Sequence, residues 1–155
     1  MLDSIPGGLP LVMGVLAAAV LAYAVYLLID QNGSIVYEVP RTAARFVAPA
    51  IFVGAAVVNY FAGGRGPEQL GVGAVLLAFA ALMLVARTGV GRAGIYADGV
   101  RRAWARIDEV SVTALEGGAG ARVTWGARGS SRDLDLPGAD PDEVREFVRE
   151  MRRSH

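Results

Sequence analysis

Carboxylate groups are the residues of this chain whose types and spacing could support acid–base or metal chemistry. Three such groups occur: Asp108 with Glu109, Asp133 with Asp135, and Asp140 with Asp142 and Glu143. Two nearby carboxylates can act as general acid and general base. Asp133 and Asp135 alternate along one predicted strand and share its solvated face, while Asp140 fits the start of a helix. We therefore interpret these acids as structural.

Nucleophilic catalysis lacks its usual partners in this sequence. The chain contains no cysteine, which excludes disulfides, zinc–thiolate sites and thiol nucleophiles, and its one histidine is His155. Serine, threonine and tyrosine are present, but no general base is evident to activate them. The glycine-rich run 117–120 does not open a helix and lacks the lysine of a phosphate-binding loop. We predict a protein that is not an enzyme and that uses no cofactor or metal.

Arginine accounts for all 15 basic residues of the chain. The candidate contacts for lipid headgroups or a protein partner are Arg87, Arg92, Arg101, Arg102 and Arg106. Basic residues beside a membrane attract anionic lipid, by about 1 kcal/mol each. The alternative is that they mark the cytoplasmic side of the membrane and form ordinary surface ion pairs, because acids accompany them. The formal net charge of zero argues against nucleic-acid binding.

The elements that must position these residues begin with a membrane segment. The chain of 155 residues is 54% hydrophobic and only 19% charged, with a mean hydropathy of +0.41, which is unusual for a soluble domain. Three apolar runs, 10–29, 44–63 and 70–86, have about the length that crosses a bilayer. We predict three transmembrane helices within residues 1–91 and a small α+β domain in residues 92–155.

The flanking arginines predict an orientation for these helices. Basic residues stay on the cytoplasmic side of short loops. The first loop, residues 30–42, contains Arg41 and is followed by Arg45. The second loop has Arg65 opposed by Glu68, and several arginines follow the third run. We predict a multi-pass protein of the cell membrane, with its N-terminus outside and the C-terminal domain in the cytoplasm.

Small residues recur at four-residue spacing in each apolar run. The pairs are Gly14 with Ala18, Ala50 with Gly54, and Ala74 with Ala78. Such rows let helix backbones approach closely in lipid and predict a compact three-helix bundle. The alternative is that an alanine-rich sequence produces these spacings by chance.

The C-terminal domain shows short alternating runs separated by turn residues, which is typical of an antiparallel meander. We predict five strands, beginning with residues 95–96, a hairpin turn at Asp98–Gly99, and a return strand over 100–107. The remaining strands are predicted over 109–116, 122–127 and 132–136. The predicted core includes Trp104, Ile107, Val110, Trp125 and Phe147.

A helix over about residues 141–153 closes the domain. Asp140 can cap its first turn, with Pro141 at the first helical position. The apolar residues Val144, Phe147, Val148 and Met151 follow with helical spacing. One stripe of the helix is therefore predicted to pack on the sheet.

The runs Gly94–Gly99 and Trp104–Val110 carry a family resemblance. Their glycine–isoleucine, aspartate–glycine, tryptophan and isoleucine residues resemble the pattern of pleckstrin-homology-like (PH-like) domains in small bacterial and archaeal membrane proteins of unknown function. The resemblance covers residues 92–153 and implies that Trp104 and Ile107 are structural. It also implies seven strands before the helix, whereas we count five, so the domain is truncated or takes strands from elsewhere.

The loop after the first apolar run could supply a missing strand. Ile35, Tyr37 and Val39 alternate with more polar residues, and the predicted orientation places this loop on the cytoplasmic side. We predict that residues 34–39 add a strand to the domain. The alternative is an interfacial loop whose apolar side chains enter the headgroups.

Two functional hypotheses follow. The first is a non-enzymatic integral membrane protein whose PH-like domain binds a protein partner or self-associates, as an accessory subunit or scaffold. The alternative is an anionic-lipid-responsive module that reads headgroups through the juxtamembrane arginines.

Overall fold

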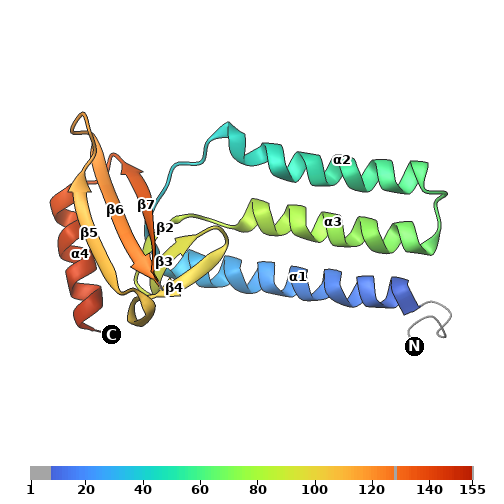
Figure 1. Cartoon of the computed structure of the whole chain (residues 1–155), viewed down its shortest axis with the longest axis horizontal. Helices are drawn as coiled ribbons and strands as arrows, with labels where there is room; N and C mark the ends of the chain where they lie inside the picture. Colours follow the sequence, from blue (N-terminus) through green and yellow to red (C-terminus); the bar gives the residue numbers. More distant parts are fainter. Residues whose placement is uncertain (1–7, 128, 155) are drawn as a thin grey trace. The chain divides into compact units, whose positions relative to one another are not determined.

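The structure is a computed structural model and describes residues 8–127 and 129–154 (Figure 1). Its α-helices are α1 (Gly8–Ser34), α2 (Val47–Ala62), α3 (Pro67–Val85) and α4 (Pro141–Arg153). Two short 3-10 helices are η1 (Ala43–Phe46) and η2 (Trp104–Arg106). The strands are β1 (Ile35–Glu38), β2 (Gly89–Gly91), β3 (Gly94–Ala97), β4 (Val100–Ala103), β5 (Glu109–Ala114), β6 (Gly120–Ala127) and β7 (Ser130–Pro137).

Contacts divide the chain into two compact units. The helical unit comprises Met1–Ile29 and Thr42–Ala86, and the β unit comprises Asp30–Arg41 and Arg87–His155. The sequence places the division between residues 91 and 92. The structure divides the chain differently, because the segment after Ile29 and the segment after Ala86 both belong to the β unit.

The helical unit contains three helices that are long and apolar enough to cross a membrane: Gly8–Ser34, Ala43–Ala62 and Pro67–Val85. The three predicted apolar helices are therefore confirmed, with shifted ends. The largest shift is at α1, which we expected to end at residue 29. Its last turn stays helical because Gln31 is only 1% exposed and its Oε1 accepts a 3.1 Å hydrogen bond from the Arg87 N–H.

Helices α2 and α3 form an antiparallel pair held by specific contacts. The Asn59 side-chain amide donates to the Gln69 carbonyl at 3.0 Å. The rings of Phe52 and Phe79 lie 6.3 Å apart. At the other end, the Arg45 guanidinium donates to the carbonyl of Leu84, in the last turn of α3, and to that of Ala86, the residue that follows the helix. Carbonyls at a helix C-terminus have no intrahelical partner, so a cation there is stabilising.

The predicted rows of small residues do not form the helix contacts. Of the six residues, only Ala78 is buried, while the others are exposed, and nothing lies within 4 Å of a Cβ built at Gly14 or Gly54. The buried small residues lie elsewhere, at Ala56 on α2 and at Gly71 on α3 among others. The prediction from the four-residue spacing is therefore wrong, because an alanine-rich helix offers several small-residue faces and the spacing does not select one.

The β unit consists of two antiparallel sheets and one helix. The first sheet has the order β1–β2–β3–β4, and the second has the order β5–β6–β7. Helix α4 packs against β5 and β6 (Figure 1). The domain thus contains seven strands rather than five, because β1 and β2 add to the five that the sequence of residues 92–155 indicates.

Strand β1 confirms the prediction that residues 34–39 pair with the sheet. Ile35 pairs with Gly91, and Glu38 pairs with Gly89. The two glycines are required by close approach, because a Cβ at Gly89 would lie 2.3 Å from the Tyr37 carbonyl oxygen. A Cβ at Gly91 would lie 2.4 Å from the Ser34 carbonyl oxygen. Strands β1 and β2 are therefore neighbours in the sheet, and helices α2 and α3 lie between them in the sequence.

One predicted strand is too long. We expected a strand over 100–107, but β4 ends at Ala103, and Trp104 begins the 3-10 helix η2. The Trp104 indole N–H donates to the carbonyls of Gly91 and Arg92, at 3.2 and 3.0 Å. A buried indole N–H needs an acceptor, and turning the chain at Trp104 supplies it.

The predicted core residues lie together. Trp104, Ile107 and Trp125 are 3%, 4% and 4% exposed, and Val110 and Phe147 pack against them half-buried. On α4, Val144 and Val148 are buried in the same core. The other features predicted for this helix also hold, since the Asp140 carboxylate accepts the N–H groups of Asp142 and Glu143 at 2.7 and 3.4 Å.

Candidate functional site

The five arginines predicted as contacts separate into different environments. Arg101 pairs with Asp30, with Nη1 and Oδ1 2.8 Å apart. Arg87 lies 3.7 Å from Glu38, and its backbone N–H binds Gln31. Both arginines are thus engaged with the 30–41 segment inside the β unit.

Arg92 stabilises the β unit through hydrogen bonds of its backbone. Its N–H donates to the Ser34 carbonyl at 2.8 Å, and its carbonyl accepts from the Trp104 indole. The side chain itself is exposed. Arg92 therefore holds the end of β2 in place, and its guanidinium faces solvent.

Arg102 and Arg106 line a cavity of about 230 Å³. Strand β4 carries the half-buried Arg102, and η2 carries the exposed Arg106. Arg132 of β7 is the third cation, and the remaining lining is Trp125, Ala127 and Ser130. No carboxylate is among these lining residues. We call this site the arginine cavity.

Arg132 was missed at the sequence level, although a signal for it exists. It has the same strand parity as Leu134 and Leu136, which are buried, so it lies on the inner face of β7. It pairs across the ladder with Trp125, which the sequence places in the core. Arg132 also forms an ion pair with Asp98 in the β3–β4 turn. A cation on the inner face at a strand end indicates an opening into the sheet.

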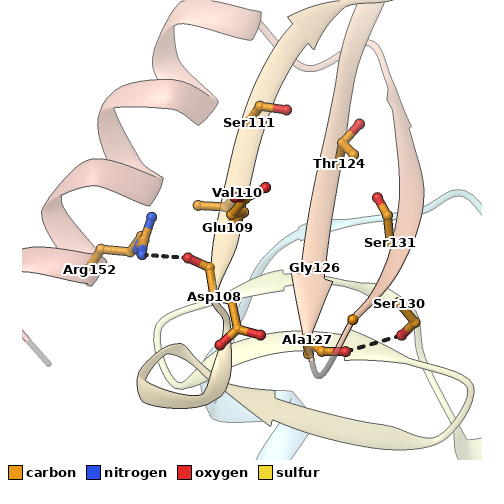
Figure 2. A pocket seen from close by; sticks show the side chains of 11 residues that line it. Asp108, Glu109, Val110, Ser111, Thr124, Gly126, Ala127, Ser130, Ser131 and Arg152 are labelled. Atoms are coloured by element: carbon orange, nitrogen blue, oxygen red, sulfur yellow. Dashed lines mark hydrogen bonds between the residues drawn. The ribbon is translucent and has the colours of Figure 1, made fainter.

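A second, wider hollow of about 640 Å³ lies on the outer face of β5–β6–β7 (Figure 2). Ser111, Thr124 and Ser131 line it from three adjacent strands, and Gly126 leaves its middle without a side chain. Arg152 reaches its rim and donates to the Asp108 carbonyl at 3.3 Å (Figure 2). The hydroxyl groups of this hollow can form hydrogen bonds with the polar surface of another molecule.

Two acids of this face, Asp133 and Asp135 of β7, are bound to side chains of the neighbouring strand β6. Thr124 Oγ1 donates to Asp133 at 2.7 Å, and Arg122 forms a bidentate pair with Asp135 at 2.6 and 3.0 Å. Hydrogen bonding to Arg122 lowers the pKa of the Asp135 carboxyl, and the same bond raises the pKa of Arg122. Within residues 8–127 and 129–154, no group of three or more His, Cys, Asp and Glu side chains could hold a metal ion.

The two edges of the β5–β6–β7 sheet differ. Along an antiparallel ladder, every second residue of a strand forms backbone hydrogen bonds with the neighbouring strand. The Leu115 N–H donates to the Gly120 carbonyl, so the odd-numbered residues of β5 bond to β6. The backbone N–H and C=O groups of the even-numbered residues therefore point away from β6. On that edge the carbonyl of Val112 accepts from Arg145 at 3.2 Å. The carbonyl of Asp108 accepts from Arg152. Helix α4 therefore covers the β5 edge.

The β7 edge is open. The Gly138 N–H donates to the Ala119 carbonyl, so the backbone groups of the even-numbered β7 residues bond to β6. The backbone N–H and C=O groups of the odd-numbered residues point away from β6. The outward backbone groups belong to Ser131, Asp133 and Asp135. Over the described residues, no hydrogen bond reaches these groups from another element. Pro137 ends the strand, as is usual at a sheet edge.

Comparison of the chain with protein-family models, with curated proteins and with solved structures finds no match.

Proposed function

We propose that this chain is an integral membrane protein whose PH-like β unit binds a partner protein by pairing with strand β7. The sheets of four and three strands followed by a helix agree with the seven strands and one helix that the resemblance implies. The three apolar helices, with most of their large side chains exposed, support a membrane anchor. The distribution of the arginines supports a protein of the cell membrane whose β unit lies on the cytoplasmic side.

The open edge of β7 carries this proposal. β7 is eight residues long, and within the part of the chain that the structure describes it pairs with β6 alone. An unpaired edge presents a row of N–H and C=O groups that another extended chain can satisfy. The β5 edge is covered by α4, so β7 is the edge of this sheet that is free for such a partner.

The charges on β7 favour a different protein over a second copy. In a two-fold antiparallel pairing centred between residues 133 and 135, Asp133 lies opposite Asp135 of the second copy, or one of them lies opposite its own copy. Like charges opposite one another are destabilising. A strand with arginine or lysine at those positions fits instead. This makes the protein an accessory subunit or scaffold, without catalysis.

Site-specific photo-crosslinking in cells tests the proposal. A photoreactive residue at Ser131 reports on the β7 edge, and the same residue at Thr113, which is exposed on β5, is the control. We expect one protein of defined mass to attach from Ser131 and not from Thr113. Asp133→Pro removes an outward N–H and no β6–β7 hydrogen bond, so it should reduce the adduct about tenfold, as the loss of one or two hydrogen bonds implies.

The matched control is Asp133→Ala, which removes the same side chain and keeps the N–H. It should retain more of the adduct than Asp133→Pro does, because it loses the charge of Asp133 but keeps the backbone pairing. Identical adducts from Ser131 and Thr113, or equal effects of the proline and alanine variants, would reject pairing at β7. An adduct with a second copy of this chain would reject the different-partner proposal.

The lipid-responsive alternative requires free juxtamembrane arginines. Arg87 and Arg101 are engaged with acids of the 30–41 segment, which reduces the candidate set. Arg92, Arg102 and Arg106 remain, and the last two share one cavity. A narrower version of this alternative concerns the arginine cavity, where two of the remaining arginines lie together.

A further inference from the structure

We propose that the arginine cavity is a binding site for a phosphate group. Three arginines line it: Arg102 from β4 of the first sheet, Arg132 from β7 of the second sheet, and Arg106 from the 3-10 helix η2 that follows β4. This inference goes beyond pairing at β7, because it concerns the inner face of the sheet and no partner strand takes part.

The charge balance of the cavity supports an anionic occupant. Arg132 has a counter-ion in Asp98. Arg102 and Arg106 have no side-chain hydrogen bond or ion pair with any residue in the described part of the chain. Two uncompensated cations at one site repel each other, and this repulsion is relieved when an anion binds between them. The residues that line the cavity therefore carry an excess of positive charge.

The donor set fits phosphate better than a carboxylate. Each guanidinium presents five N–H donors in a planar fork, and pairs of these donors match the oxygens of phosphate. A carboxylate has only two oxygens to share among the three arginines. A phosphate monoester offers three strong acceptor oxygens and a charge approaching −2.

The size and walls of the cavity suit a phosphate ester. Its volume of about 230 Å³ is several times that of one water molecule, which occupies about 30 Å³ in the liquid. Trp125 and Ala127 form an apolar wall, and the exposed Ser130 adds a hydroxyl. The monoester could belong to a phospholipid such as phosphatidic acid or to a soluble phosphate compound. Both share the chemistry that the arginines recognise.

The experiment uses the full chain in phosphatidylcholine nanodiscs. In the first arm, inorganic phosphate and glycerol 3-phosphate are titrated by calorimetry, with tryptophan fluorescence as a second readout because Trp125 lines the cavity. In the second arm, phosphatidic acid is added to the bilayer, and native mass spectrometry counts the phosphatidic acid molecules retained per protein. Saturable binding in the first arm identifies a soluble ligand, and retention in the second identifies a lipid. Either result supports the phosphate site.

Matched variants decide whether the arginine cavity is responsible. Arg102→Gln and Arg106→Gln each remove charge-assisted hydrogen bonds and should weaken binding about tenfold or more. Arg149→Gln removes the same charge from the exposed surface of α4, outside the cavity, and should change binding less than about twofold. Circular dichroism spectra that match the parent's establish that each variant is folded.

Two outcomes overturn the proposal. One is the absence of binding in both arms. The other is an equal loss of binding in all three variants, which means that net charge, rather than the cavity, attracts the anion.

Discussion

The Tyr96 hydroxyl donates a 2.8 Å hydrogen bond to the Asp30 carboxylate, which joins the last turn of α1 to strand β3 within the β unit. The Tyr96 residue is fully buried, and the other carboxylate oxygen of Asp30 binds Arg101. One carboxylate thus holds groups from β3 and β4, although 66 residues separate it from Tyr96.

Removing this carboxylate should destabilise the β unit. Asp30→Ala leaves the buried Tyr96 hydroxyl without its acceptor, at an expected loss of about 1–3 kcal/mol. Tyr96→Phe removes the donor and leaves Asp30 bound to Arg101, so we expect about 1 kcal/mol. Denaturant unfolding followed by tryptophan fluorescence measures both losses, because Trp104 and Trp125 both belong to the β unit. The double variant should lose less than the sum, and strict additivity would show that the two side chains do not interact.

Tyr96 should also make the β unit sensitive to alkaline pH. Burial raises the pKa of Tyr96 above the ordinary value of 10.0, and Asp30 adds to the rise by hydrogen bond and charge. Because the folded state favours the protonated phenol, its stabilisation is complete below pH 10.0 and is lost as pH rises through the folded pKa.

The alkaline dependence can be assigned by variants. Tyr37 also has a raised pKa, through burial and the charges of Glu143 and Asp140, so it contributes to the same window. We expect Tyr96→Phe to flatten part of the fall in unfolding free energy above pH 10 and Tyr37→Phe to flatten another part. Phenolate absorbance titration gives the pKa values directly. An unchanged pH profile in Tyr96→Phe would contradict the expectation.

A soluble β unit should require both of its segments. The fragment 92–155 lacks β1 and β2, so it loses the fully buried Val90 and the Gly91 carbonyl that accepts from Trp104. We expect it to show no near-ultraviolet circular dichroism of packed tryptophans. The Val39 N–H donates to the Thr88 carbonyl at 2.9 Å, so a short Asn-Gly turn can join these residues in place of 40–87.

The joined chain, 30–39 followed by the turn and 88–155, should fold and unfold cooperatively. The contrast between the two chains is the measurement. A folded 92–155 fragment would show that β1 and β2 are dispensable and that the domain is complete without the segment before α2.

Glycines at the β1–β2 contact should be sensitive to a single methyl group. Gly89→Ala places a Cβ 2.3 Å from a backbone oxygen of β1, so the strands must separate, at an expected cost of about 1–3 kcal/mol. The control is Gly126→Ala, whose Cβ meets nothing closer than 3.7 Å. Unfolding of the full chain in detergent should separate the two variants, and equal stability would contradict the close approach.

The sequence by itself determined the features that depend on local pattern. Long uncharged runs identify three apolar helices, alternation and turn residues identify β3, β5, β6 and β7, and Asp140 with Pro141 marks the start of α4. Even the strand at residues 35–38 could be inferred from its alternation. These signals reside in a few neighbouring residues, so a single sequence is enough to read them.

Only the tertiary structure decided the features that depend on distant residues. Strand β2 contains only three residues, Gly89–Gly91, and forms because β1 approaches its glycines closely. Strand β4 ends at Trp104 because the indole finds its acceptors at Gly91 and Arg92. Arg102, Arg106 and Arg132 share a cavity because two sheets meet there, whereas Arg101 pairs with Asp30. Residue types predict which groups can bind, but packing across the fold decides which of them meet.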